Sequence, residues 1–401
     1  ANDDEAAYVR MMGGHKLSRN DEDRYKYYVI SETALAELRR ATNELHAFFM
    51  HATNYVLSDE KLLEPFNIPR LLWGRIQQSW SNRRNQMITG RFDFTLSERG
   101  LKVYEYNCDS ASCHMETGKI QGKWARHYGC DEGFDPGQKL HELLRDAWRH
   151  SDVDDVLHIM RDRDLEETYH ALFMQEAMEE AGIRSRIIDG VDGLGWDANG
   201  NVVDPDGDRV KWVWKTWAWE TALDQLRAEC EEDDIRLPAA RTSRAPRLVD
   251  VLLSPDVLVY EPLWTLIPSN KAILPVLSSM FPEYQYILES SYELTDALRQ
   301  GGYVEKPIVG RGGANIAIYG RDQQVRAETG GRFGERDRVY QARFPLPQVG
   351  GYYVQVCTFT AAGRYAGACL RVDASPVINM ESENIALRVV RDSELEDDSA
   401  D

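Results

Sequence analysis

The sequence predicts a mixed α/β fold in which antiparallel hairpins are joined to a smaller, parallel α/β lobe. Three features support this: an amphipathic helix near the N-terminus, two hairpin patterns with glycine at their turns, and a strand–helix–strand pattern between the hairpins. A chain of 401 residues can bury a large core and can hold two or three domains.

Apolar residues recur at helical spacing over residues 32–57, which predicts a long helix with one face on a core. Residues 1–30 are polar and predict a lead-in or linker, and the acidic residues 391–401 predict a tail. The sequence therefore predicts one folded unit over residues 31–390.

The middle of the chain carries the pattern of a small parallel sheet. Residues 156–160 and 183–188 read as buried strands, and residues 166–181 between them read as a helix that Gly182 ends. A strand, a helix and a strand in this order predict an α/β lobe over about residues 150–260.

Residues 91–107 predict a β-hairpin, because both halves alternate and are rich in Phe, Tyr and Val. Gly100 suits the left-handed last position of a three-residue loop, Glu98–Gly100. This loop sets a register that pairs residue 97 with 101, 95 with 103, 93 with 105 and 91 with 107.

The same register gathers polar side chains on one side of the hairpin. Asp93 faces Glu105, and Arg91 faces Asn107. Two opposed carboxylates repel each other, and a bound cation would turn that cost into a site. Carboxylate and amide oxygens are hard ligands, so the expected ion is Mg²⁺ with nucleotide phosphates. The alternatives are a solvated acidic hairpin and a register shifted by one residue.

A second hairpin, residues 303–320, places Lys306 just before the glycine-rich turn Gly310–Gly313. Glycines let backbone amides approach phosphate oxygens, and Lys and Arg supply the opposite charge. The motif is not a P-loop, because the GxxxxGK[ST] spacing is missing. An ordinary glycine-rich turn is the alternative.

Composition limits the classes of partner. The net charge is -19, with 66 acidic and 47 basic residues, which argues against nucleic acid and anionic membranes and favours cationic ligands. No apolar run approaches the roughly 18 residues of a membrane span. Six cysteines without CxxC pairs predict free thiols in the cytoplasm. The expected partners are small molecules, and the sequence leaves a homodimer open.

Several blocks of sequence, in order over roughly residues 50–385, resemble the synthetase domain of glutathionylspermidine synthetase. That family is related to trypanothione synthetase and has an ATP-grasp-type fold, which implies antiparallel sheets that clasp ATP. The blocks are RFDF with VYEYNCDSASC (91–113), DLEETYH (164–170), VWKTWAWET (213–221), EPLWTLIPSNKAILP (261–275), EKPIVGRGG (305–313) and VQVCTFT with GACLR (354–371).

The resemblance implies an ATP-dependent C–N ligase. ATP would phosphorylate the glycine carboxylate of glutathione, and an amine of spermidine would attack the acyl phosphate. The products would be glutathionylspermidine, ADP and phosphate, with ATP as co-substrate and two Mg²⁺ ions. The alternatives are a trypanothione-type or other amine ligase, and an inactive homologue that binds polyamine or nucleotide.

The resemblance also implies roles for residues. The arginines around the transferred phosphate are Arg91, Arg311 and Arg371, and the Mg²⁺ ligands are Asp93, Glu105 and Asn107. The ATP-binding residues are Arg91, Lys271, Lys306, Gly312, Gly313, Gln341, Gln355, Pro376 and Ile378. The glutathione-binding residues are Arg91, Ser110, Ser112, Glu167, Thr216 and Thr221, and the polyamine-binding residues are Glu166 and Glu383.

For some of these residues, an ordinary structural role is the alternative. An arginine such as Arg371 can serve an ordinary ion pair, and Glu166 and Glu167 can cap the helix that they open. Cys113 matches a cysteine near the glutathione thiol and is not needed for ligation. The chain departs from bacterial relatives at Met380, where they have lysine, and at Glu383, where they have aspartate. No cysteine precedes Cys108, so no N-terminal amidase domain is expected.

Overall fold

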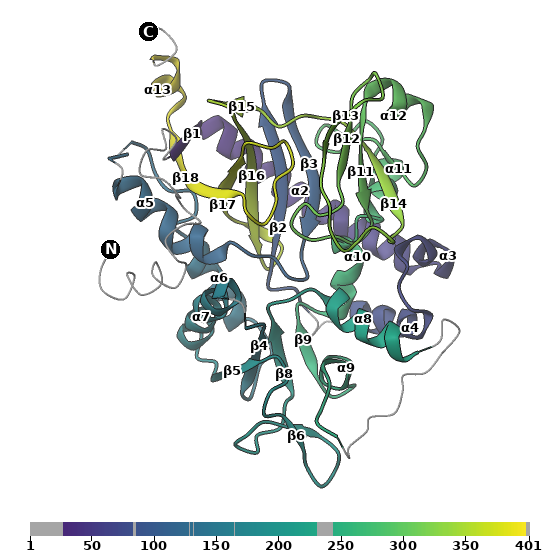
Figure 1. The fold of residues 1–401 in the computed structure, drawn as a ribbon. Coiled ribbons are helices and arrows are strands. Elements are labelled where there is room, and N and C mark those ends of the chain that lie inside the picture. The colour runs from purple at the N-terminus through teal and green to yellow at the C-terminus, as the bar shows by residue number, and fades with distance from the viewer. Residues whose placement is uncertain are drawn as a thin grey trace.

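The structure is a computed structural model, and it describes residues 27–82, 86–127, 129–130, 132–163, 165–230 and 244–397. A seven-stranded sheet forms the centre, a five-stranded sheet stands beside it, and a four-stranded sheet lies below both (Figure 1). This mixed arrangement confirms the predicted α/β class.

The central sheet has the order β1-β18-β17-β16-β2-β3, with β15 paired to β16. Its neighbours are antiparallel except β1 and β18, which are parallel. Its strands are β1 (Tyr27–Ser31), β2 (Thr89–Ser97), β3 (Gly100–Asn107), β15 (Gln348–Val349), β16 (Tyr352–Ala361), β17 (Arg364–Asp373) and β18 (Glu383–Val390).

Strand β1 corrects the expected lead-in over residues 1–30. The last of these residues, from Tyr27 on, lie in the central sheet, where Ile30 is buried. Residues 1–26 lie outside the described residues. At the other end of the unit, the acidic tail begins with helix α13 (Asp392–Asp397), and Asp392 accepts hydrogen bonds from the backbone and hydroxyl of Thr33.

Helix α2 (Glu32–Leu57) confirms the predicted helix at 32–57. Ser31 caps its first turn by accepting a hydrogen bond from the amide of Ala34. Its buried face packs on β16 and β17 of the central sheet, and α5 and α6 cover the opposite face at β16–β18. Part of the central sheet is therefore a layer between helices, and its strands are buried on both faces.

The hairpin of β2 and β3 confirms the predicted pairs nearest the acidic cluster. Asp93 lies opposite Glu105, and Arg91 lies opposite Asn107. The predicted pairs nearer the turn are wrong, because residue 95 faces 102 and residue 97 faces Gly100. The turn holds two residues instead of three, and a bulge between Asp93 and Phe94 restores the register beyond it.

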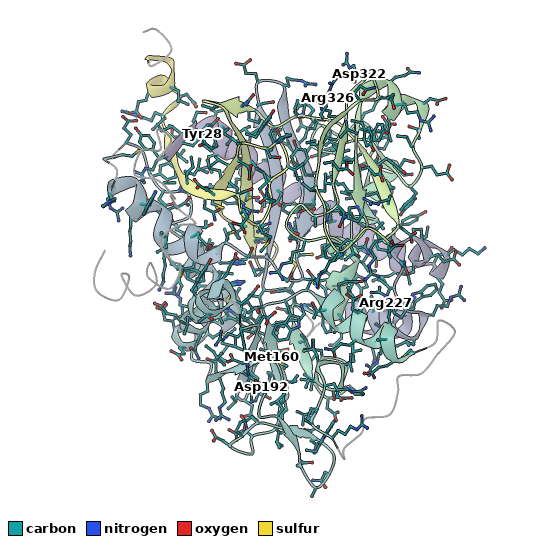
Figure 2. The ribbon with its side chains drawn as sticks, viewed as in Figure 1. Tyr28, Met160, Asp192, Arg227, Asp322 and Arg326 are labelled. Atoms are coloured by element: carbon teal, nitrogen blue, oxygen red, sulfur yellow. The ribbon has the colours of Figure 1, made fainter. Side chains whose placement is uncertain are left out.

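The five-stranded sheet contains the second predicted hairpin. Its β11 and β12 pair antiparallel, as the sequence predicts, and its order is β10-β14-β11-β12-β13. Figure 2 places Asp322 and Arg326 at the outer tip of this sheet. The strands are β10 (Ser290–Ser291), β11 (Tyr303–Pro307), β12 (Ala317–Tyr319), β13 (Val325–Glu328) and β14 (Arg338–Ala342).

The four-stranded sheet is the predicted α/β lobe. All its strands are parallel, in the order β5-β4-β8-β9, and helix α7 (Leu165–Glu180) connects β4 to β5. Met160 on β4 marks its buried interior in Figure 2. The strands are β4 (Leu157–Arg161), β5 (Ser185–Asp189), β8 (Trp212–Lys215) and β9 (Leu258–Tyr260), and a ribbon of β6 (Gly195–Trp196) and β7 (Val202–Val203) is attached.

Short helices connect and cover the sheets. None of the helices within the described ranges is long and apolar enough to cross a bilayer. The α-helices not yet given are α3 (Glu60–Leu63), α4 (Trp73–Ser81), α5 (Gln121–His127), α6 (Leu140–Arg149), α8 (Trp219–Glu229), α9 (Leu248–Leu252), α10 (Leu266–Ser269), α11 (Ile273–Met280) and α12 (Asp296–Gly301). A π-turn spans Glu116–Ile120, and 3₁₀ turns span Glu64–Phe66, Arg70–Leu72 and Leu263–Thr265.

Phe49 is the aromatic side chain through which α2 meets the hairpin. It is fully buried, and its ring lies edge-on to Phe92 at 5.6 Å and to Tyr106 at 5.3 Å. We predict that Phe49→Ala lowers the free energy of unfolding by about 3–5 kcal/mol, because a cavity replaces the ring. Urea denaturation followed by circular dichroism measures this. Tyr55→Ala, on the exposed side of the same helix, should change the value by less than about 0.5 kcal/mol.

Candidate active site

A cavity of about 430 Å³ lies where residues of the central sheet, the five-stranded sheet and the lobe come together. It gathers all the predicted site residues except Glu167, Thr216, Thr221 and Glu383. The predicted residues that line it are Arg91, Asp93, Glu105, Asn107, Ser110, Ser112, Glu166, Lys271, Lys306, Arg311, Gly312, Gly313, Gln341, Gln355, Arg371, Pro376 and Ile378.

Polar side chains of the hairpin line one part of this cavity. Arg91 and Asp93 are both buried, and the Nε of Arg91 donates to the Oδ1 of Asp93 at 2.8 Å. Asn107 Nδ2 lies 3.4 Å from Asp93 Oδ2 and 3.3 Å from Glu105 Oε1. Burial opposes the charge of Arg91, but the nearby Asp93 carboxylate outweighs it and holds the guanidinium pKa above its usual value.

Two lysines approach the acidic face of the hairpin. Lys271 pairs with Glu105 at 2.9 Å, and Lys306 donates to the side-chain oxygen of Gln341 at 2.7 Å. Burial would raise the pKa of Glu105, but the two ammonium groups outweigh burial and lower it to about 2. Burial lowers the pKa of Lys306 to about 8. The cavity thus holds an ionised carboxylate beside an ammonium whose pKa burial lowers.

Neighbouring strands of the central sheet bring further polar residues into line. Arg371 lies opposite Gln355 on one side and opposite Asn384 on the other. Arg371 donates to the carbonyl of Asn379, while its Nε and the Oδ1 of Asn384 are buried without a hydrogen-bond partner among the described residues. Buried polar atoms of this kind mark a place where a ligand or water can bind.

The glycine-rich turn of the second hairpin reaches the segment before β18. Gly312 and Gly313 have φ values of +57° and +68°, a left-handed conformation that favours glycine. A Cβ on Gly313 would lie 2.3 Å from the carbonyl oxygen of Ile378, and a Cβ on Gly312 would lie 2.4 Å from Cγ of Met380. Met380 therefore covers the turn.

Two of the four predicted residues outside the cavity lining lie at the carboxyl ends of lobe strands. Glu167, in the first turn of α7 after β4, accepts a hydrogen bond from Arg311 at 2.8 Å. Thr216 follows β8 directly and is buried. Glu167 Oε2, Thr216 Oγ1 and the indole nitrogen of Trp217 are buried without a hydrogen-bond partner in the described structure.

The strand order explains why these atoms gather. The chain passes from β4 to β5 on one side, and β8 pairs with β4 on the other side. In open parallel sheets, ligands bind at the carboxyl end of the strands where the order reverses in this way. The unpartnered atoms after β4 and β8 lie at this switch point.

The structure does not bring Thr221 and Glu383 into the cavity. Thr221 is exposed on α8. Glu383 begins β18, and its neighbour Asn384 lines the cavity, because successive side chains point to opposite faces of a strand.

Sequence reasoning missed other lining residues, including Asp109, Glu220 and Asn384. Asp109 follows the predicted ligand Asn107 by two residues, and this nearness in sequence could have indicated it, although β3 ends at Asn107. Glu220 gave no such signal. It is buried and paired with Arg227 and Arg336, contacts that depend on tertiary packing.

The hairpin donors suit a hard divalent cation. Asp93 and Glu105 offer carboxylate oxygens, and turning over the Asn107 amide would present its oxygen where its nitrogen now stands, near both. A second cluster, His141 with Glu176 and Glu180, lies on α6 and α7. Its carboxylates pair with Lys119 and lie near Arg145, and its three residues are not among those that line the cavity.

Comparison with known proteins shows the family of the chain. Residues 7–390 match the family model described as glutathionylspermidine synthase preATP-grasp. The chain belongs to this family. It is 50% identical over 373 residues to the bifunctional glutathionylspermidine synthetase/amidase of Escherichia coli, covering 92% of this chain and 60% of that protein.

Further relatives place the chain in the same family and fold. It is 38% identical to trypanothione synthetase of Crithidia fasciculata, over 93% of this chain and 58% of that protein. The chain thus spans about 60% of the length of the curated relatives that it matches. A glutathione synthetase-like effector of Globodera pallida shares the fold, with a TM-score of 0.52 and 11% identity over 90% of this chain and 88% of that one.

The buried Arg91–Asp93 ion pair leads to a prediction of how mutation of this hairpin changes the free energy of unfolding. Asp93→Ala should lower the free energy of unfolding by about 3–5 kcal/mol, because it leaves the buried Arg91 charge without its partner. Asp93→Asn should cost less, since an amide oxygen still accepts from Arg91. Chemical denaturation of both variants measures the difference. Equal stability of Asp93→Ala and wild type would contradict the proposed importance of the pair.

Proposed function

We propose that this chain is an ATP-dependent ligase that joins the glycine carboxylate of glutathione to an amine of spermidine. The observation that carries the proposal is one cavity lined by Asp93 and Glu105 of the hairpin together with seven cationic side chains. The five cations proposed to act in the reaction are Arg91, on the hairpin itself, and Lys271, Lys306, Arg311 and Arg371. Membership of the glutathionylspermidine synthase family supports the choice of substrates.

The proposed chemistry needs charge and position more than covalent catalysis. The γ-phosphate of ATP moves to the glycine carboxylate of glutathione, and ADP leaves. The amine then attacks the acyl phosphate, and a tetrahedral anion collapses to release phosphate. Arg91, Arg311 and Arg371 are suited to both anionic species, because a guanidinium binds paired oxygens in a fixed fork. Preorganised cations in a buried site give the strongest electrostatic stabilisation.

Asp93, Glu105 and Asn107 are the proposed Mg²⁺ ligands, and two ions are proposed. Mg²⁺ at these residues would neutralise the nucleotide phosphates. Lys271 and Lys306 approach the same acidic face of the hairpin and are the proposed partners of the β- and γ-phosphates. The proposed adenosine contacts are Gln341, Gln355, Pro376 and Ile378, and the glycine-rich turn at Gly312 and Gly313 is proposed to approach the phosphates. All six residues line the cavity.

The acceptor subsites are proposed at the lobe side of the cavity. Glu167 and Thr216 offer unpartnered oxygens at the switch point, which suits the polar glutathione backbone beside Ser110 and Ser112. Glu166 lines the cavity and is the proposed carboxylate for the polyamine ammonium. The six cysteines are all free, which supports a reducing compartment such as the cytoplasm.

We predict that the purified chain releases ADP from ATP and Mg²⁺ in the presence of glutathione only when spermidine is also present. Mass spectrometry should find a product with one glutathione on one spermidine. A second glutathione on the product would favour the trypanothione-type reaction. No ADP release with any polyamine would refute the ligase function.

The same assay tests the hairpin. Asp93→Asn should lower kcat by about 100-fold or more, because a neutral amide replaces the carboxylate that would hold Mg²⁺ against the phosphates. Glu98→Gln is the matched control, since Glu98 is exposed at the turn of the same hairpin and should leave kcat unchanged. Full activity of Asp93→Asn would remove Asp93 from the proposed metal site.

Lys306 predicts how nucleotide affinity depends on pH. Burial lowers its pKa to about 8, so the ammonium is largely charged at pH 7 and largely neutral at pH 9. Phosphate binds the charged form. The Kd of a non-hydrolysable ATP analogue with Mg²⁺ should therefore rise above pH 8, by at most about tenfold per pH unit for one proton. Calorimetry from pH 7.5 to 9.5 measures this, and Lys306→Met should remove the dependence.

A further inference from the structure

Lys215 is a buried cation beneath the active-site loop that follows the hairpin. It ends β8, and its side chain is 1% exposed. Its Nζ donates to the carbonyl oxygens of Asp109 at 2.6 Å and Trp217 at 3.0 Å, and it lies 5.0 Å from the ring centre of Trp219. The ammonium thus ties the carboxyl end of a lobe strand to the first residue of the loop.

The loop, residues 109–113, is held at both ends by buried cations. Lys215 binds its first carbonyl, and the carboxylate of Asp109 accepts a hydrogen bond from the backbone of Trp219 at 3.0 Å. Near the other end, Nη1 of Arg91 lies 3.2 Å from the carbonyl oxygen of Ser112 and 3.3 Å from its hydroxyl oxygen. The whole loop lines the cavity.

The stability of the fold does not by itself explain why a charged residue is buried at this position. Burial lowers the pKa of Lys215 to about 8, even though the carboxylates of Asp109 and Glu261 favour the ammonium. An apolar side chain of similar volume often stabilises a buried position as well as an ion does. The ammonium instead fixes a geometry, because it holds two carbonyl oxygens from separate segments of the chain at fixed distances from its nitrogen.

We infer that Lys215 is a positioning residue that sets the arrangement of the loop carrying Ser110 and Ser112. The inference rests on the proposed function, in which these serines face glutathione. The nucleotide-facing lysines, Lys271 and Lys306, make their contacts with the hairpin and with Gln341, away from Lys215. Loss of Lys215 therefore weakens the binding of glutathione, whose glycine carboxylate accepts the phosphate. It leaves the binding of the nucleotide unchanged.

The test replaces the charge while keeping the volume. Lys215→Met in the full chain should lower kcat/KM for glutathione by about tenfold or more, with the larger part in KM. The Kd of a non-hydrolysable ATP analogue with Mg²⁺ should stay within about twofold of wild type. Lys211→Met is the matched control, because Lys211 is a nearby lysine that is half exposed and pairs with Asp155 at the surface. This control should leave both values unchanged.

Two outcomes would overturn the inference: an unchanged kcat/KM for glutathione, or an equal loss of nucleotide affinity, which would indicate general disruption. Where Lys215→Met does not fold by circular dichroism, Lys215→Arg decides. Its longer, forked side chain keeps the charge and should raise KM for glutathione with kcat within about threefold, and wild-type kinetics would count against the inference.

Calorimetry separates this inference from the ligase proposal. A wild-type chain that releases no ADP would refute the proposed ligase, while the Kd of glutathione still tests the loop. Lys215→Met should raise that Kd by about tenfold, and an equal Kd in the two proteins would overturn the positioning role.

Discussion

The buried ion pair between Arg91 and Asp93 is the interaction on which the cavity side of this protein depends. It lies on the cavity face of β2, and through Arg91 it also holds the loop at Ser112. Either charge alone would be costly to bury, so each residue requires the other. The pair keeps a guanidinium charged and fixed in place before any substrate arrives, which is the condition for electrostatic stabilisation without reorganisation. The arrangement of the hairpin, of the loop and of the cavity lining therefore depends on this one ion pair.

Much of the fold could be predicted from local patterns. The periodicity of residues 32–57 gave α2 with its bounds, and the strand–helix–strand order gave β4, α7 and β5. The hairpin register was right at Asp93 and Glu105 and wrong near the turn, because two errors compensated: the turn is shorter than predicted, and a bulge takes up the difference. A bulge depends on the strands that flank the hairpin, and no local pattern reports it.

The candidate site shows the same division between local and distant information. Strand alternation located the acidic cluster, and the family resemblance located Lys271, Arg311 and Arg371. Neither indicated Lys215 or Glu220, because the partners of these residues lie in segments distant in the chain or in a later turn of the same helix. The resemblance also named Glu383, yet its neighbour Asn384 faces the cavity. Side-chain direction at the first residue of a strand is set by tertiary pairing, which a matched motif does not contain.

The parallel pairing of β1 with β18 has a consequence for biosynthesis. β18 lies between β1 and β17, so the strand nearest the N-terminus finds its only neighbour in the described sheet at residues 383–390. During translation, β1 cannot pair until residues 383–390 have left the ribosome, and the part of α2 that packs on β16 and β17 must wait for residues 352–373. Such long-range closure is slow and leaves hydrophobic surface exposed in the meantime. Nascent chains of this protein should therefore depend on chaperones until β18 is made.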